Sequence, residues 1–339
     1  MENNVKKDLI SIIIPVCNEE GTLEELHQRV NNVIQSLSNY DFEIIFINNA
    51  SEDQSEVICR RICENDNNWK YIQFSRNFGI EASFFAGAYY AKGDALIYLF
   101  SDLQDPPEAI PRIIEKWKEG NEVVYGVLKK REDQTLTKSI GAFFAYRLIY
   151  FLCDIKIPIN ATDYRLLSRK VINAMINCKE RNRYMRGITH WIGYKQNSFE
   201  FERAPRKSGV SNAGVMWCIK YALSVIFSFS IKPIRISGIV GIFTMILSFL
   251  GAVGYTILTV LTRTGVWDIP APPTGITTIV LLIFFFGGIQ CLFLGILGEY
   301  ITQIHSEAKF RPVWVLADAI GFEDTVFQVN KMDHRRDDY

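Results

Sequence analysis

The stretch Tyr98–Glu108, YLFSDLQDPPE, changes abruptly from an apolar run to a polar loop. The run that enters it, ALIYLF (95–100), has the composition of a buried strand. Asp102, Gln104 and Asp105 follow, and the double proline after them ends the element. Carboxylates at the carboxyl end of a strand commonly hold a divalent cation beside a bound phosphate group. The stretch therefore predicts a phosphate and metal site, although a simple polar loop with a Pro-Pro stop fits it equally well.

The chain before this stretch alternates between apolar runs and segments with helical spacing. This alternation predicts an α/β fold with a mostly parallel sheet, whose strand carboxyl ends share one edge. The polar loops CNEEGT and NNASEDQS begin where strands end, so a nucleotide site can be assembled at that edge. Neither GxGxxG nor GxxxxGK[ST] occurs, which argues against a Rossmann dinucleotide site and a P-loop. Strands are predicted at 9–16, 42–47, 71–75 and 95–100, and helices at 23–37, 55–65 and 76–93.

Composition separates the chain into a polar part and an apolar part. The 339 residues carry 37 basic and 37 acidic side chains, so no net charge favours a nucleic-acid partner. Residues 236–261 and 274–298 contain no charged side chain. Each can form a helix of roughly 38 Å, which exceeds the ~30 Å hydrocarbon core of a bilayer. The sequence therefore predicts two membrane spans. The seven cysteines form no CxxC pair or ligand cluster, which is typical of packing residues in a reduced compartment.

Charges beside the two apolar segments predict their orientation. Basic residues lie before the first segment, in 232–235, and after the second, at His305, Lys309 and Arg311. The turn between the segments, 262–273, has one Arg balanced by one Asp. The positive-inside rule then places both termini in the cytoplasm and the turn outside, in a multi-pass protein of the inner membrane.

A third apolar segment, residues 213–231, carries Lys220 as its single charge. We interpret it as a helix that lies in the plane of the membrane interface. The alternative is a third span, which would put the N-terminal domain and the C-terminal tail on opposite sides of the membrane.

Seven short motifs follow one another between residues 12 and 212. They are IIIPVCNEE, INNASED, SRNFGIEASFFAGAYYAKGD, SDLQDPPE, YGVLKKRED, NATDYRLLSRK and RAPRKSGVSN. Together with the paired apolar segments, they resemble the GT-A-fold, family-2 inverting glycosyltransferases. More narrowly, they resemble the polyprenyl-phosphate branch, which includes dolichol-phosphate mannose synthase and the bactoprenol glucosyltransferases. The resemblance implies a cytoplasmic GT-A nucleotide-sugar-binding domain (1–212), an interfacial amphipathic helix (213–233), a two-helix transmembrane hairpin (234–303) and a cytoplasmic tail (304–339).

The resemblance also implies which residues bind a nucleotide-sugar donor, with a UDP-sugar favoured over GDP- and dTDP-sugars. Asn48 and Asn49 stand where two aspartates are usual, and Ala50 stands where glycine or serine is usual. Because Asn donates as well as accepts hydrogen bonds, base recognition can differ from the family pattern. Arg76 either reaches the donor or only pins its own loop. The implied donor-binding residues are Pro15, Asn18, Glu19, Asn48, Asn49, Ser51, Asp53, Arg76, Ser101, Asp102 and Gln104.

By the same resemblance, Asp102 and Gln104 hold Mg²⁺ or Mn²⁺ against the donor diphosphate. The usual motif is Asp-x-Asp-x-Gln, and Phe100 occupies the position of its first aspartate. The loss of one carboxylate should weaken metal binding without abolishing it, because diphosphate and water oxygens supply most of an octahedral shell. Asp105 is interpreted as a turn or capping residue before the two prolines.

Asp163, in TDYRL, matches the catalytic aspartate of the family. A lipid phosphate reaches the site already anionic, so it needs positioning and charge neutralisation more than a base. The predicted role of Asp163 is to orient this phosphate or to accept a residual proton. The alternatives are that it braces the site, caps a helix or pairs with Arg165.

The resemblance implies a cluster that binds the acceptor phosphate just ahead of the membrane. Arg and Lys suit such a site because they offer several N–H donors. Two positions depart from the family pattern, where Leu128 replaces an Arg and Asn212 a Lys. The same cluster can also be interpreted as a juxtamembrane patch that contacts anionic lipids. The implied acceptor-binding residues are Arg131, Arg203, Arg206, Lys207 and Ser211.

The sequence thus predicts an enzyme that moves one sugar from a nucleotide sugar to polyprenyl (undecaprenyl) phosphate at the cytoplasmic leaflet. Its lipid-linked product would serve glycan modification of the cell envelope, such as lipopolysaccharide, and the family favours a homo-oligomer. A processive polysaccharide synthase is disfavoured, because RNRYMRG (181–187) is present and QxxRW is absent. A catalytically inactive scaffold in a membrane complex is the alternative, and the motif departures favour it.

Overall fold

A computed structural model describes residues 7–129, 158, 161–181, 183–204, 230–264 and 275–322. The chain forms two compact units. The first contains residues 1–147, 155–218 and 310–339, and the second contains residues 148–154 and 219–309. Several predicted features lie outside the described residues, namely Arg131, Arg206, Lys207, Ser211 and the 213–229 part of the expected interfacial helix.

The first unit is built on an eight-stranded sheet with the order β7-β5-β6-β4-β1-β2-β3-β8. Its centre is parallel and consists of β4, β1, β2 and β3, so the predicted mostly parallel α/β fold is confirmed. Next to β4, β6 is antiparallel to both β4 and β5, and β7 runs parallel to β5. The strands are β1 (Asp8–Val16), β2 (Tyr40–Asn48), β3 (Trp69–Phe74), β4 (Ala95–Tyr98), β5 (Val123–Leu128), β6 (Ala161–Ser168), β7 (Gln196–Phe201) and β8 (Leu316–Ile320).

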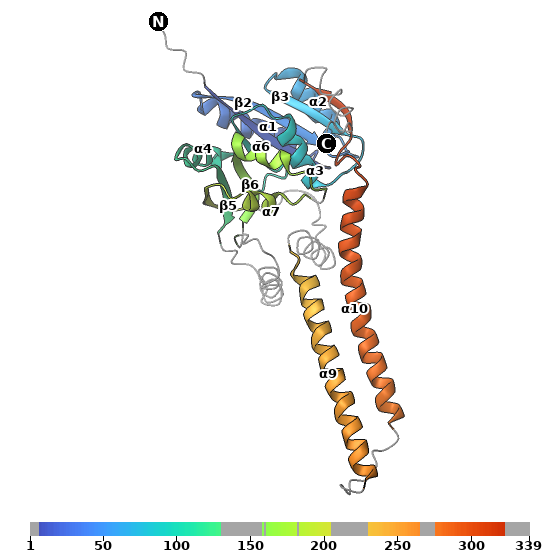
Figure 1. The fold of residues 1–339 in the computed structure, drawn as a ribbon. Coiled ribbons are helices and arrows are strands. Elements are labelled where there is room, and N and C mark those ends of the chain that lie inside the picture. Colours follow the sequence, from blue (N-terminus) through green and yellow to red (C-terminus); the bar gives the residue numbers. More distant parts are fainter. Residues whose placement is uncertain are drawn as a thin grey trace, which may run out of the picture. The chain divides into compact units, whose positions relative to one another are not determined.

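Helices cover both faces of this sheet (Figure 1). Alternation along β1 sends Ile10, Ile12 and Ile14 into a core shared with α1, α2 and α4. On the other face, α3 approaches β1 at Gly87, where an added Cβ would lie 2.3 Å from Ile13 Cγ2. The missing side chain therefore lets α3 lie directly on the sheet, with α6 and α7 beside it. The helices are α1 (Leu23–Ser36), α2 (Ser55–Asn65), α3 (Ile80–Tyr90), the short 3₁₀ helix η1 (Pro107–Ala109), α4 (Ile110–Lys118), α6 (Arg169–Asn177) and α7 (Met185–Ile192).

The strand β8 lies within residues 304–339, for which the sequence predicts only a tail. It pairs antiparallel with β3, with Tyr71 opposite Ile320. Ser75 N–H donates to Val315 O at 2.9 Å, and Arg60 pairs with Asp318 at 2.7 Å. The segment LADAI is too short and mixed to be recognised alone. The unpaired backbone groups at the edge of β3 supply the partner that makes it a strand.

The second unit contains two long helices, α9 (Lys232–Arg263) and α10 (Ile276–Ala308). Within them, Lys232–Gly251 and Leu282–Ala308 are long and apolar enough to cross a membrane, each with a mean hydropathy of 1.9. Large apolar side chains are exposed on both helices, including Phe243 (66%) and Phe284 (75%). Such surfaces are unfavourable in water and match a hydrocarbon environment.

Candidate active site

Three loops follow the carboxyl ends of β1, β2 and β4, and each turns through left-handed backbone. The residues are Asn18, Ala50 and Leu103, with φ values of 56°, 55° and 58°. This conformation costs a non-glycine residue roughly 1–2 kcal/mol, although Asn tolerates it better. Such strained backbone persists where surrounding contacts hold it in place. Here the left-handed residues bend the chain sharply just past the sheet edge.

The first two loops are tied together by hydrogen bonds between side chains and backbone. Asn18 N–H donates to Ser51 Oγ at 3.0 Å, and Glu52 N–H donates to Asn18 Oδ1 at 2.8 Å. Glu20 N–H donates to Asp53 Oδ2 at 3.0 Å. The predicted donor residues Asn18, Ser51 and Asp53 therefore lie together, with these polar atoms holding the loops in shape.

Asn48 belongs to the same supporting network and is fully buried. Its amide nitrogen donates to Tyr71 Oη at 2.9 Å and to Gln73 Oε1 at 2.8 Å. Its Oδ1 accepts from Ser51 N–H at 3.0 Å and from Ser51 Oγ at 2.7 Å. An ionised Asp could not donate to the Gln73 oxygen, so Asn suits this environment. Its side chain therefore supports the loop that follows β2.

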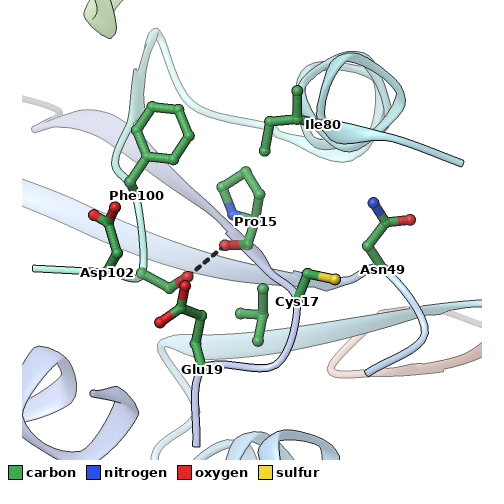
Figure 2. Close-up of a pocket in the computed structure, with 9 residues that line it drawn as sticks. Pro15, Cys17, Glu19, Asn49, Ile80, Phe100 and Asp102 are labelled. Carbon is green, nitrogen blue, oxygen red and sulfur yellow. Dashed lines mark hydrogen bonds between the residues drawn. The ribbon is translucent and has the colours of Figure 1, made fainter. Parts of the chain in front are cut away.

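A cavity of about 230 Å³ opens at the ends of β1 and β4 (Figure 2). Ser101 Oγ donates to Pro15 O at 2.9 Å across it. Asn49 is held there by its own N–H, which donates to Val16 O, and by its Oδ1, which accepts from Phe78 N–H at 2.8 Å. Five predicted donor residues thus meet at one cavity. Its lining consists of Pro15, Val16, Cys17, Glu19, Asn49, Ile80, Phe100, Ser101 and Asp102.

A second cavity of about 550 Å³ shares Cys17, Asn49 and Ile80 with the first. Its remaining walls come from residues 77–82, from Arg181 and Arg183, and from Val313 of the segment before β8. Arg76 lies apart from this lining, because its guanidinium donates to Asn77 O at 3.0 Å and stacks on Phe78 at 4.0 Å. These contacts support the interpretation that Arg76 pins its loop.

Asp102 is the predicted metal ligand that faces the first cavity. Its Oδ1 accepts from Gln104 N–H at 3.1 Å, while the Gln104 amide nitrogen donates to Ala204 O at 3.4 Å. Phe100 also lines the cavity and packs against Phe84. In the part of the chain that the structure describes, no group of three or more His, Cys, Asp or Glu side chains could hold a metal. Mg²⁺ often binds through one or two carboxylates and substrate phosphates, so Asp102 fits a site that the donor diphosphate completes.

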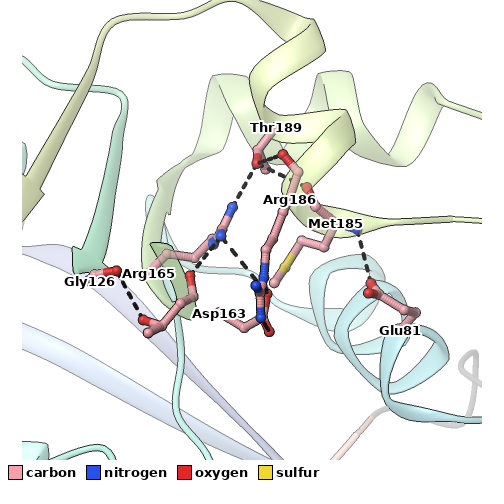
Figure 3. Close-up of polar contacts among 8 residues, drawn as sticks. Glu81, Gly126, Asp163, Arg165, Met185, Arg186 and Thr189 are labelled. Atoms are coloured by element: carbon pink, nitrogen blue, oxygen red, sulfur yellow. Dashed lines mark hydrogen bonds and ion pairs between the residues drawn. The ribbon is translucent and has the colours of Figure 1, made fainter. Parts of the chain in front are cut away.

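Asp163 lies on β6 in a network of charged groups (Figure 3). Arg186 Nε donates to Asp163 Oδ1 at 2.6 Å, and Arg186 Nη2 contacts the second carboxylate oxygen. Arg165 Nη2 lies farther away, 3.9 Å from Asp163 Oδ1, and donates to Thr162 O and through Nη1 to Thr189 Oγ1. Burial raises the pKa of Asp163, but the charge and hydrogen bonds of Arg186, together with the charges of Arg165 and Arg203, outweigh burial and hold this pKa below its usual range.

Two members of this network, Glu81 and Arg186, were not among the site residues that the sequence predicts. Glu81, in the first turn of α3, accepts a hydrogen bond from Met185 N–H at 3.0 Å (Figure 3). Burial, reinforced by the negative charge of Asp163, raises the pKa of Glu81 to about 8. The sequence signal for Glu81 was a lone carboxylate in the otherwise apolar helix IEASFFAGAYY. Arg186 had no such signal, because only the fold brings α7 to β6.

Asp105 forms a buried ion pair with the predicted acceptor residue Arg203. The Asp105 side chain is completely buried, whereas that of Arg203 is 24% exposed. Both Nε and Nη2 of Arg203 approach Asp105 Oδ1, at 3.2 and 3.1 Å. Burial raises the pKa of Asp105 to about 6, against the opposing effect of Arg203. The structure thus makes Asp105 a buried carboxylate with an ionic partner, where the sequence suggested a turn or capping residue.

Comparison with known proteins identifies the family. The model of glycosyl transferase family 2 matches residues 11–176. Among solved structures, glucosyl-3-phosphoglycerate synthase from Mycobacterium tuberculosis is 16% identical, with a TM-score of 0.44 over 65% of this chain and 79% of that chain. The uncharacterized glycosyltransferase YkcC of Bacillus subtilis is 39% identical over 315 residues, which are 93% of this chain and 95% of YkcC. A bactoprenol glucosyl transferase of Shigella phage SfV is 36% identical over 309 residues, which are 91% of this chain and 97% of that protein. The chain belongs to glycosyl transferase family 2 and has its GT-A-type α/β fold.

Proposed function

We propose that this protein moves one sugar from a nucleotide sugar to polyprenyl phosphate at the cytoplasmic face of the membrane. The similarity to a bactoprenol glucosyl transferase over nearly the whole chain supports the lipid acceptor. The two long apolar helices support a location in the membrane, because they are long enough to cross it. The acceptor lipid is found in the same membrane. The product would be a lipid-linked sugar for cell-envelope glycans.

The observation that carries the proposal is the state of Asp163. Arg186 engages both of its oxygens and holds its pKa low, so Asp163 is a weak proton acceptor. A hydroxyl acceptor would need a stronger base to become a nucleophile. A lipid phosphate has already lost its proton near neutral pH, so it needs no base to act as a nucleophile. The geometry therefore fits a phosphate acceptor better than a sugar hydroxyl.

The chemical step follows from this arrangement. A phosphate oxygen of the lipid attacks the anomeric carbon from the face opposite the nucleotide, and the bond to the nucleoside diphosphate breaks. This in-line displacement inverts the configuration at that carbon. Asp102 and the cavity around Pro15 and Ser101 would hold the donor, with Gln104 assisting. A bound Mg²⁺ or Mn²⁺ would neutralise charge on the departing diphosphate. Asp163, through Arg186, would orient the acceptor phosphate.

The acceptor test uses the full chain in detergent or in vesicles. Undecaprenyl phosphate and undecaprenol are supplied in parallel with a panel of UDP-, GDP- and dTDP-sugars. We expect transfer to the phosphate, best with a UDP-sugar, and no measurable transfer to the alcohol, which lacks both the charge and a ready nucleophile. Efficient glycosylation of undecaprenol would contradict the proposal. Donor binding without transfer to any lipid would favour the inactive scaffold instead.

Membrane topology gives a second test, which is independent of activity. We expect an impermeant maleimide to label a cysteine placed at Thr264 in intact cells, because the 262–273 turn should face outward. A cysteine placed at Lys309 should react only after the membrane is opened. Cys17 is exposed in the first unit and serves as the internal control, since it should also require opening. Labelling of position 309 from outside would instead mean that residues 213–231 cross the bilayer.

A further inference from the structure

The loop that follows β4 is joined directly to the chain segment that follows β7. Gln104 O accepts a hydrogen bond from Ala204 N–H at 3.2 Å. The Gln104 side chain donates back to Ala204 O at 3.4 Å. Asp105, the residue after Gln104, pairs with Arg203, the residue before Ala204. Residues 102–105 and 203–204 are therefore held together by two hydrogen bonds and an ion pair.

The geometry of the ion pair leaves Arg203 able to act on another group. Both of its contacts go to one oxygen of Asp105, and they use two of its five N–H donors. The side chain of Arg203 keeps some exposure, whereas Asp105 has none. The carboxylate thus holds the guanidinium from the protein side, and among the described residues the other three N–H donors have no hydrogen-bond partner.

A role in stability alone does not account well for this pair. Taking a carboxylate out of water costs several kcal/mol, and well-packed apolar residues often stabilise a core as well as a buried ion pair does. A buried carboxylate that orients a partly exposed arginine is, by contrast, typical of a site built in advance for an anion. The nearby pair of Glu108 with Arg29 is more exposed on both sides and offers a comparison on the same stretch of chain.

We propose that Asp105 is a positioning residue that holds Arg203 for the acceptor phosphate, with the loop after β4 (residues 102–105) fastened to the segment after β7 (residues 203–204). This inference rests on the proposed function. The residues that face the donor (Asp102) and the acceptor (Arg203) would then belong to one linked unit. Asp105 would act on catalysis only through Arg203, because its own side chain is completely buried.

A double-mutant cycle on the full-length enzyme tests this coupling. We expect Arg203→Ala to lower kcat/KM for undecaprenyl phosphate by about 10- to 150-fold, the range for a lost charge-assisted hydrogen bond. Asp105→Asn should lower it by roughly tenfold, because Asn pairs more weakly with a guanidinium. The double variant should be no worse than Arg203→Ala alone. The Kd of the donor nucleotide should stay within about threefold of wild type throughout, and Glu108→Gln should change neither constant.

Chemical rescue separates positioning from a general loss of structure. Guanidinium at millimolar concentration should raise the activity of Arg203→Ala at least tenfold, because Asp105 would hold the added cation in place. The double variant also lacks the Asp105 carboxylate that would hold the added cation. The same guanidinium should therefore restore little of its activity. Equal rescue in both backgrounds, or losses that multiply in the double variant, would overturn the inference. If the wild-type enzyme failed to glycosylate the lipid at all, the proposed function would fall, and this inference with it.

Discussion

Asp102→Asn is expected to lower the transfer rate by at least about 100-fold, since electrostatic stabilisation of a departing group is typically worth 10²- to 10³-fold. Asp102 is the carboxylate of the β4 loop that lines the cavity proposed to bind the donor, and the neutral amide would no longer attract a divalent cation. EDTA should abolish the activity of the wild-type enzyme, and Mg²⁺ or Mn²⁺ should restore it. The measurement is the initial rate of sugar transfer as the metal concentration is varied.

Two matched variants sharpen this prediction. Glu108→Gln removes a carboxylate from the same stretch of chain, but one that pairs with Arg29 outside the cavity, so its metal dependence should be unchanged. Phe100→Asp restores the first carboxylate of the usual motif at a position that lines the cavity, so it should lower the metal concentration needed for half-maximal rate. Full turnover of the wild type in EDTA would exclude the metal role of Asp102.

Asp163→Asn is expected to reduce kcat by about 100-fold, the typical cost of misplacing a reacting group by about 1 Å. The substitution removes the charge that faces Arg186 and the buried Arg165, so these guanidinium groups repel each other and lose their alignment. Breaking a buried ion pair also costs about 3–5 kcal/mol, and partial exposure of both partners should bring the loss of stability below that range. Single-turnover rates and the apparent Tm measure the two effects.

The double variant Asp163→Asn with Arg186→Gln distinguishes catalysis from bracing. It removes both charges of the closest pair, so the apparent Tm should recover much of the loss seen in Asp163→Asn. The transfer rate should remain low, because the proposed orientation of the acceptor needs both the carboxylate and the guanidinium. Recovery of the rate together with the Tm would show that Asp163 only braces the site.

The sequence predicted the parallel centre of the sheet well, because its signals are local. An apolar run such as 42–47 must be buried on both faces, and the polar loop after it must lie at the strand end. The structure extends β2 to Tyr40–Asn48 and places α2 at Ser55–Asn65, where the pattern predicts them. The position of the cavity at this edge follows from the same logic, because carboxyl ends of parallel strands meet at one edge whatever the details of packing.

The sequence did not reveal which polar side chains are partners and which face the cavity. Asn48 and Asn49 are adjacent in the sequence. The Asn48 side chain forms hydrogen bonds with Tyr71, Gln73 and Ser51, whereas Asn49 lines the cavity. Alternation along a strand sends neighbours to opposite faces, but the partner on each face comes from another element. Tyr71 and Gln73 lie more than twenty residues from Asn48, so no spacing pattern in the sequence points to these two hydrogen bonds.

By itself, the sequence determined the alternating α/β order, the loops that carry Asp102 and Asn49, and the two apolar segments, since each depends on residues close together in the chain. Only the tertiary structure decided that Arg186 faces Asp163, that Arg203 meets a buried Asp105, and that LADAI becomes the edge strand β8. These contacts join residues far apart in sequence, and the two ion pairs also depend on burial. The low dielectric of the interior is what makes a charged group require a partner, and the fold alone determines which partner is within reach.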